Sequence, residues 1–222
     1  MRLNADLSQR VVIDTGTVPW VQSPAHGVDR RMLDRIGDEV AVATTIVRYL
    51  PQTTFHSHTH GAGEEILVLH GSFSDEHGTY PAGTYLRNPP GTSHAPQPEA
   101  GCTIFVKLRQ FTPGDTQQVV IDTAQGSWHH ANAPGVQCQA LHSAGGIDTQ
   151  LLQWSAGASW SPASVEGGME LLVLHGELHD AHGSYRAGTW LRYPRGSAAT
   201  FVATEGARAY VKTGHIGATF VS

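Results

Sequence analysis

The chain contains two copies of one sequence, and this duplication limits the folds open to it more than any other feature. Residues 67–71 read LVLHG, and residues 172–176 repeat these letters 105 positions later (172 − 67 = 105). Upstream, Trp20 and Gly27 recur as Trp128 and Gly135 at an offset of 108 (128 − 20 = 108), so one loop differs by three residues. A period of this length indicates tandem domains and not a solenoid. Further identities at offset 105 are at Asp75, His77, Gly78, Tyr80, Ala82, Gly83, Thr84, Leu86, Arg87, Pro89, Gly91, Val106 and Lys107.

A turn-rich segment separates the two copies. Residues 112–115 read TPGD, a combination of Pro, Gly and Asp that is typical of a linker. We therefore expect two domains, residues 1–114 and residues 115–222, each of the size usual for a small domain.

The local pattern of each copy predicts β-strands. Residues 40–50 and 65–70 are apolar or alternate between apolar and polar, and Gly and Pro bound them. The chain has 25 Gly and 12 Pro, which suits many short strands joined by tight turns. Residues 29–35 alone have weak helical character. The expected fold class is all-β, with one small barrel or sandwich in each copy.

Composition and charge exclude several partners. The net charge is −5 with neutral histidine and no basic face is evident, which argues against nucleic acid as a partner. No apolar run is long enough to span a bilayer, and the first ten residues lack a signal-peptide core. Cys102 and Cys138 form neither a CxxC motif nor a disulfide framework and are expected to be small buried hydrophobes. We expect a cytoplasmic protein.

One cluster of residues in the first copy carries metal-binding chemistry. His56, His58 and His60 alternate, so in a strand their imidazoles share one face. A glycine-rich turn and Glu64 follow, and His94 comes directly after a second tight turn. Three neutral imidazoles and one carboxylate would hold a divalent ion with a net charge of about +1 and leave coordination positions open.

The second copy is an internal control for this assignment. The positions of His58, His60, Glu64 and His94 hold Ala163, Val165, Met169 and Ala199, so the proposed ligands vanish together. Glu65, His70 and His77 are kept as Glu170, His175 and His182, which favours structural roles for them. We therefore predict that the first copy binds one metal ion and the second binds none.

Weaker candidates remain beside the four ligands. His56 becomes Ser161 in the second copy and is a candidate to face the metal or its ligand, as are Arg48 and Tyr85. Two other readings of the cluster stay open, namely an exposed polar strand and a site that no longer holds a metal.

The spacing of these residues resembles the cupin family. Its first motif, His-x-His, Glu and Gly, corresponds to His58, His60, Glu64 and Gly71. Its second motif corresponds to Gly83, Pro89, Gly91 and His94; Pro98 and Gln52 depart from the usual Asn and Gly at turn positions. The resemblance implies two tandem cupin barrels, that is, jelly-roll or double-stranded β-helix folds, with the four ligands converging inside the first.

The first copy is most similar to the cupin domain of ChrR-type anti-sigma factors. Residues 58–65 (HTHGAGEE), residues 87–94 (RNPPGTSH) and residues 27–33 (GVDRRML) carry this resemblance. It implies zinc as the metal and a role in sensing singlet oxygen or organic peroxide, with iron, manganese and nickel as alternatives. The sigma-binding part of such proteins is a separate helical domain with a CxxC zinc site, which this sequence does not contain, and this argues against direct sigma-factor binding.

Two functional classes follow from the same ligands. The first is a metal-binding sensor or regulatory protein that takes part in an oxidative stress response. The second is a mononuclear non-haem metal dioxygenase or a related oxidoreductase acting on a small molecule. Both predict a small-molecule ligand or oxidant at the metal, and the second barrel is expected to support the first or a homodimer.

Overall fold

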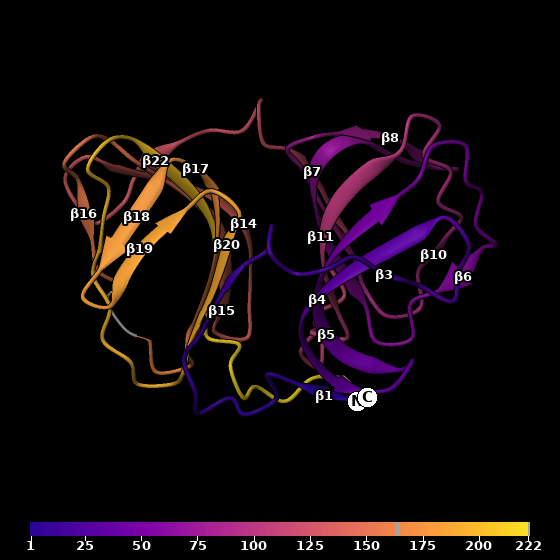
Figure 1. The fold of residues 1–222 in the computed structure, drawn as a ribbon, viewed down its shortest axis with the longest axis horizontal. Helices are drawn as coiled ribbons and strands as arrows, with labels where there is room; N and C mark the ends of the chain where they lie inside the picture. Colours follow the sequence, from indigo (N-terminus) through magenta and orange to yellow (C-terminus); the bar gives the residue numbers. More distant parts are fainter. Residues whose placement is uncertain (163–164, 222) are drawn as a thin grey trace. The chain divides into compact units, whose positions relative to one another are not determined.

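The computed structural model describes residues 1–162 and 165–221, and every regular element in them is a β-strand. All strand pairs are antiparallel, and the strands curl into two compact units, one built mostly from each copy (Figure 1). This confirms the all-β fold with two tandem barrels. The described residues contain no helix that could cross a membrane.

The first unit comprises Met1–Ala5 and Val18–Gly126, together with the segment that begins at Thr219. Its main sheet has the order β1-β4-β5-β11-β7-β9-β12, with β3 beside β4 and β8 beside β7, while β6 and β10 form a separate pair. The strands are β1 (Arg2–Leu3), β3 (Val21–Gln22), β4 (Val28–Gly37), β5 (Ala41–Tyr49), β6 (His58–Thr59), β7 (Glu64–Asp75), β8 (Gly78–Pro81), β9 (Thr84–Asn88), β10 (Ser93–His94), β11 (Cys102–Leu108) and β12 (Val119–Asp122).

The second unit comprises Asp6–Thr17 and Ser127–Ala218. Its two sheets have the orders β13-β14-β15-β22-β17-β20-β2 and β16-β21-β18-β19. The strands are β2 (Val11–Asp14), β13 (His129–His130), β14 (Val136–Ala144), β15 (Ile147–Trp154), β16 (Ser159–Trp160), β17 (Met169–His175), β18 (Glu177–Asp180), β19 (Gly183–Arg186), β20 (Thr189–Tyr193), β21 (Phe201–Val202) and β22 (Ala207–Thr213).

Each unit takes one strand from the beginning of the other copy. Strand β2 pairs with β20 in the second unit, and β12 pairs with β9 in the first. Both exchanged strands have the sequence VVID, 108 positions apart (119 − 11 = 108). The predicted division between residues 114 and 115 follows the boundary between the two sequence copies. As a boundary between structural domains it stays a prediction.

The expected helical character of residues 29–35 is wrong. These residues lie in the middle of β4, which pairs with β5 along most of its length, with Arg30 opposite Val47. Local propensity is weak evidence over seven residues, and pairing with a neighbouring strand overrides it.

The interiors of the two barrels differ. The apolar core of the first unit includes Val47, Ile104 and Val106 and leaves space toward one end. The core of the second unit includes, among its described residues, the large side chains of Trp154 and Trp160. The two copies therefore share a fold but fill their interiors with different side chains.

The charged residues shared by both copies are buried. In the first unit, Arg87 makes a two-point contact with Asp115, at 2.8 and 3.2 Å, and lies 3.9 Å from Glu65. Lys107 donates a hydrogen bond to Thr44. Paired charges in a core are a structural feature, in agreement with their presence in the copy without the ligands.

Candidate metal centre

Two segments that are distant in sequence form the frame of the site. Strand β6 pairs with β10, which places His94 directly opposite His58. The His60 amide donates to the Thr92 carbonyl at 2.8 Å, and the Gly91 amide donates to the His60 carbonyl at 2.9 Å. Gly91 has a φ of 88°, a conformation that favours glycine and lets the chain turn before His94. The backbone therefore fixes where the three imidazoles stand.

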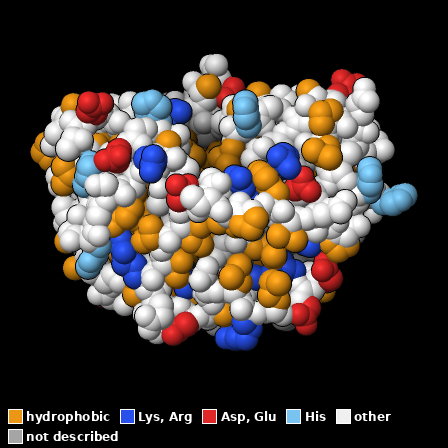
Figure 2. Space-filling view, viewed as in Figure 1, with side chains coloured by type: hydrophobic (Ala, Val, Ile, Leu, Met, Phe, Trp, Pro, Cys, Tyr) orange, Lys and Arg blue, Asp and Glu red, His pale blue; other side chains and the backbone are white. Residues whose placement is uncertain are grey.

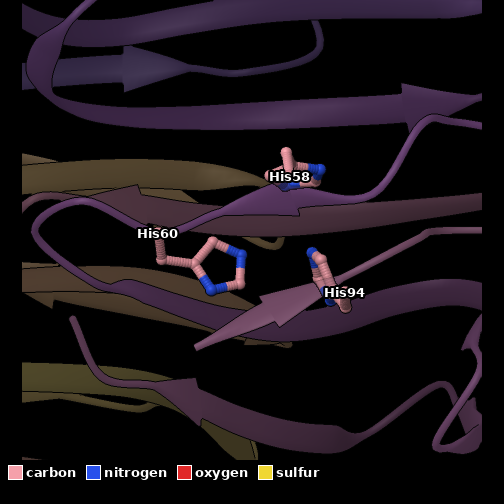
Figure 3. A group of neighbouring side chains, drawn as sticks. All are labelled: His58, His60 and His94. Carbon is pink, nitrogen blue, oxygen red and sulfur yellow. The ribbon is translucent and has the colours of Figure 1, made fainter. Parts of the chain in front are cut away.

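The three histidines converge on one point. One ring nitrogen from each of His58, His60 and His94 lies within 4.8 Å of the other two, and the three rings face a common space (Figure 3). Glu64, the first residue of β7, adds a carboxylate: its Oε2 lies 3.2 Å from His60 Nε2 and 3.5 Å from His94 Nε2. The three histidine nitrogens thus have the spacing expected around a divalent ion, and Glu64, which contacts two of the histidines, stays a predicted fourth ligand.

The hydrogen bonds around the site leave the Nε2 atoms of two histidines available. Nδ1 of His60 contacts the Thr92 hydroxyl at 2.9 Å, and Nδ1 of His94 lies 3.2 Å from Asp75 Oδ2. Nε2 of His60 is buried and, among the described residues, its contact with Glu64 Oε2 at 3.2 Å does not have hydrogen-bond geometry. A buried polar atom without a well-aligned partner is costly, and a metal ion at this point would satisfy it. The donor set therefore fits a bound metal.

The protonation states of the site suit metal binding. Burial raises the pKa of Glu64, but its close contact with His60 and the positive charge that the three histidines carry when protonated outweigh this and lower the pKa below the usual value. Burial is the main cause that lowers the pKa of His94, although Glu64 opposes it. An ionised carboxylate and a neutral imidazole are the forms that bind a metal.

Histidine content alone does not locate this site. Pale-blue histidine side chains are scattered over the molecular surface in Figure 2. His60 and His94 are buried, but His58 is exposed, and His142 and His215 of the second unit are buried as well. The convergence of the ring nitrogens, and not burial, separates the cluster from the remaining histidines.

Asp75 contacts one of the candidate ligands and also stabilises a turn. Its Oδ1 accepts the turn amides of His77 and Gly78. Its Oδ2 also orients His94, which the sequence did not reveal. The second copy keeps this residue as Asp180, so the comparison of copies pointed to structure.

Asp180, the counterpart of Asp75 in the second copy, explains why the sequence did not reveal the contact between Asp75 and His94. Asp180 caps the same turn through the amides of His182 and Gly183, but its second oxygen contacts the hydroxyl of Tyr193 in place of a histidine. An aspartate therefore stabilises the turn in both copies, but it orients a candidate ligand only in the first copy.

Asp75→Asn should weaken metal binding about ten- to a hundredfold, because the amide nitrogen cannot accept a hydrogen bond from His94 Nδ1. The measurement is a competition titration with a chromophoric chelator. Asp180→Asn is the matched control, since it alters the same turn in the second unit and should leave metal affinity unchanged. Equal affinity for Asp75→Asn and the wild type would contradict the role given to Asp75.

In the second copy, the equivalent positions are apolar. Val165 and Met169 belong to the buried core cluster, and Ala199 packs against it. Ala163, the counterpart of His58, lies outside the described residues. That the second barrel binds no metal stays a prediction.

The weaker candidates from the sequence lie in different places. His56 lines a cavity beside the metal cluster. Arg48 pairs with Asp29 at 2.6 Å and stacks on Trp20. Tyr85 is fully buried on β9. Their proposed role of facing the metal or its ligand stays a prediction.

A cavity of about 870 Å³ opens beside the site within the first barrel. His58 and Glu64 form part of its wall, so a small molecule in the cavity would lie against the metal cluster. This volume is in the range of ordinary small-molecule sites. Most of its inner lining is apolar and comes from β4, β5 and β11: Val28, Val47, Tyr49, Ile104, Val106 and Leu108.

Comparison with known proteins supports the assignment of the fold. The sequence model of the family described as ChrR Cupin-like domain matches the chain twice, over residues 8–112 and 116–217. A comparison with curated proteins found no matching relative.

Similar solved structures have low sequence identity and therefore concern the fold alone. A Nostoc punctiforme protein assigned provisionally as a dioxygenase aligns with a TM-score of 0.77 and 15% identity, over 96% of this chain and 85% of its own. A cupin 2 conserved barrel domain protein from Leptotrichia buccalis has a TM-score of 0.63 and 10% identity, over 91% and 95%. A variant of Bacillus subtilis oxalate decarboxylase has 0.60 and 13%, over 95% and 78%.

Proposed function

The chain belongs to the family of ChrR-like cupin domains, and from this premise we propose that it is a regulatory metal protein whose first barrel binds one divalent ion, zinc before other metals. The ligands in this proposal are His58, His60, Glu64 and His94. The observation that carries it is the buried His60 Nε2, which has no hydrogen-bond partner among the described residues and faces Glu64 and His94.

Other side chains of the barrel position the proposed ligands. Thr92 and Asp75 orient two imidazoles, and Asn88 contacts the Glu64 carboxylate at 3.4 Å. A bound metal would supply a Lewis acid with open positions for a small molecule or an oxidant. The apolar walls of the cavity would exclude bulk water from that molecule. Signal perception at the metal, as in the oxidant-sensing role that the family resemblance implies, is the function proposed for this chain.

Metal content is the direct test. Protein purified without an affinity tag should contain about one equivalent of zinc per chain, and His60→Ala should lose most of it. His70→Ala is a suitable control because His70 is exposed, lies in the middle of β7 and should leave the content unchanged. Two equivalents at equivalent sites, or a full metal content in His60→Ala, would refute the proposed site.

The cavity favours a second candidate function, oxidation of a small molecule. A partly open cavity with apolar walls beside an open metal position suits a cupin oxidoreductase of the dioxygenase type. Native iron together with oxygen uptake would favour this candidate, whereas native zinc without oxygen uptake would favour the sensor.

A further inference from the structure

Arg30 faces the interior of the first barrel. Successive side chains of a strand point to opposite faces, so on β4 Val28 and Arg30 share one face. Both line the cavity beside the metal cluster. On the other face, Asp29 pairs with Arg48 at 2.6 Å, and Arg31 stacks on Trp20 with its guanidinium carbon 4.2 Å from the ring centre. The two neighbouring arginines of the strand therefore lie on different faces.

Arg30 has no anionic partner in the described part of the chain. Its guanidinium makes no ion pair or hydrogen bond there, and its Nε is shielded from solvent. Arg30 instead lies near another positive charge, that of Arg35. The pKa of Arg35 is lowered mainly by burial and next by the positive charge of Arg30. A partly buried guanidinium without a counter-ion is costly, so a ligand that supplies one would be stabilised.

Without a ligand, the cavity and its proposed metal site carry an excess of positive charge. Among its described lining residues, Glu64 is the acidic one and Arg30 is the single lysine or arginine. Glu64 is directed at His60 and His94 and would be shared with the metal. A divalent ion, Glu64 and Arg30 together carry a net charge of about +2. An anionic ligand would offset part of this charge.

The second copy provides an internal control for Arg30. Arg30 pairs with Val47 in the strand register, and the equivalent pair is Cys138 with Leu152. Cys138 packs against the apolar core of the second unit. The arginine is therefore absent from the copy in which the ligand positions have become apolar.

We propose that the cavity of the first barrel binds a small organic carboxylate, with its carboxylate on Arg30 and its apolar body on Val47, Ile104 and Val106. This inference rests on the proposed function, since it names the class of molecule that the metal site receives. A planar guanidinium binds a carboxylate through two parallel hydrogen bonds, which one arginine can supply alone. The apolar lining selects a hydrocarbon chain or an aromatic ring for the remainder of the ligand.

Calorimetric titration with matched probes tests the proposal. Hexanoate and benzoate carry the charge, and hexanamide and benzamide are their neutral counterparts of similar shape. Zinc-loaded protein should bind each carboxylate at least tenfold more tightly than its amide. Arg30→Gln should abolish this preference, and Arg30→Lys should retain part of it. Arg31→Gln, the same change on the opposite face of β4, should keep the full preference.

The outcomes separate this proposal from the metal assignment. Carboxylates that bind no better than amides, or a preference that survives Arg30→Gln because the carboxylate binds the metal alone, would overturn it. If Arg30→Gln fails to fold, the affinities for carboxylate and amide are compared in the wild type and in Arg30→Lys. A preference for the carboxylate in the wild type that is reduced in Arg30→Lys then supports the proposal, and an unchanged preference overturns it. Metal content is measured on the same samples. Protein that takes up no zinc under loading conditions but still binds benzoate through Arg30 would overturn the metal site and leave the anion site standing.

Discussion

Removal of the metal is expected to lower the melting temperature of the protein, with the first unit unfolding before the second. The proposed ligands come from segments that are distant in sequence, because His94 follows His60 by 34 positions (94 − 60 = 34). A ligand that binds the native state alone stabilises it by about 4 kcal/mol at a thousandfold excess over its dissociation constant. Without the ion, the buried His60 Nε2 has no hydrogen-bond partner in the described residues.

Differential scanning calorimetry before and after chelation measures this effect, and hydrogen exchange locates it. Amides of β6 and β10 should lose protection first, because these two-residue strands pair with each other and not with the main sheet. His60→Ala protein serves as the control, since a chelator should not change its melting further. Unchanged melting after metal removal, verified by elemental analysis, would contradict the prediction.

Asp115→Ala is expected to destabilise the first unit by about 3–5 kcal/mol, the usual cost of breaking a buried ion pair from one side. Arg87 is 2% exposed and makes its two-point contact with Asp115. Burial lowers the pKa of Arg87, but the bond with Asp115 and the charge of Glu65 outweigh this and raise it. Removal of Asp115 takes away one of these stabilising contacts, yet an arginine guanidinium stays charged in proteins. The mutation therefore leaves a buried charge without its closest partner.

Urea unfolding followed by circular dichroism measures this loss of stability. Glu99→Ala is the control, because Glu99 is an exposed carboxylate of the same unit and its loss should change stability by less than about 0.5 kcal/mol. A similar small effect for Asp115→Ala would show that Arg87 does not depend on this contact. The result also bears on the domain boundary, because Asp115 is the first residue after the predicted division but contacts Arg87 of the first copy.

The sequence determined the duplication, the all-β fold and the position of the histidine cluster. These features are local or periodic: the His-x-His spacing, the glycine-rich turn before Glu64 and the tight turn before His94 are all visible in the sequence. The strand expected along residues 56–60 is limited to His58–Thr59 in the structure, and His56 lies outside the cluster of ring nitrogens. The second copy strengthened the assignment because the ligand positions changed as a set. Glu64 and the three histidines needed no knowledge of tertiary contacts to be named together.

Tertiary structure alone decided which contacts surround that cluster. The exchanged strands β2 and β12 have the same sequence, so no local pattern could tell which edge each one joins. Asp75 looks like a turn residue in both copies, and only folding brings its second oxygen to His94. Arg30 and Arg31 are chemically identical neighbours, and the face that each occupies depends on how β4 pairs with β5. A side chain has a partner only where the fold brings another group within reach, and these contacts join residues far apart in the sequence.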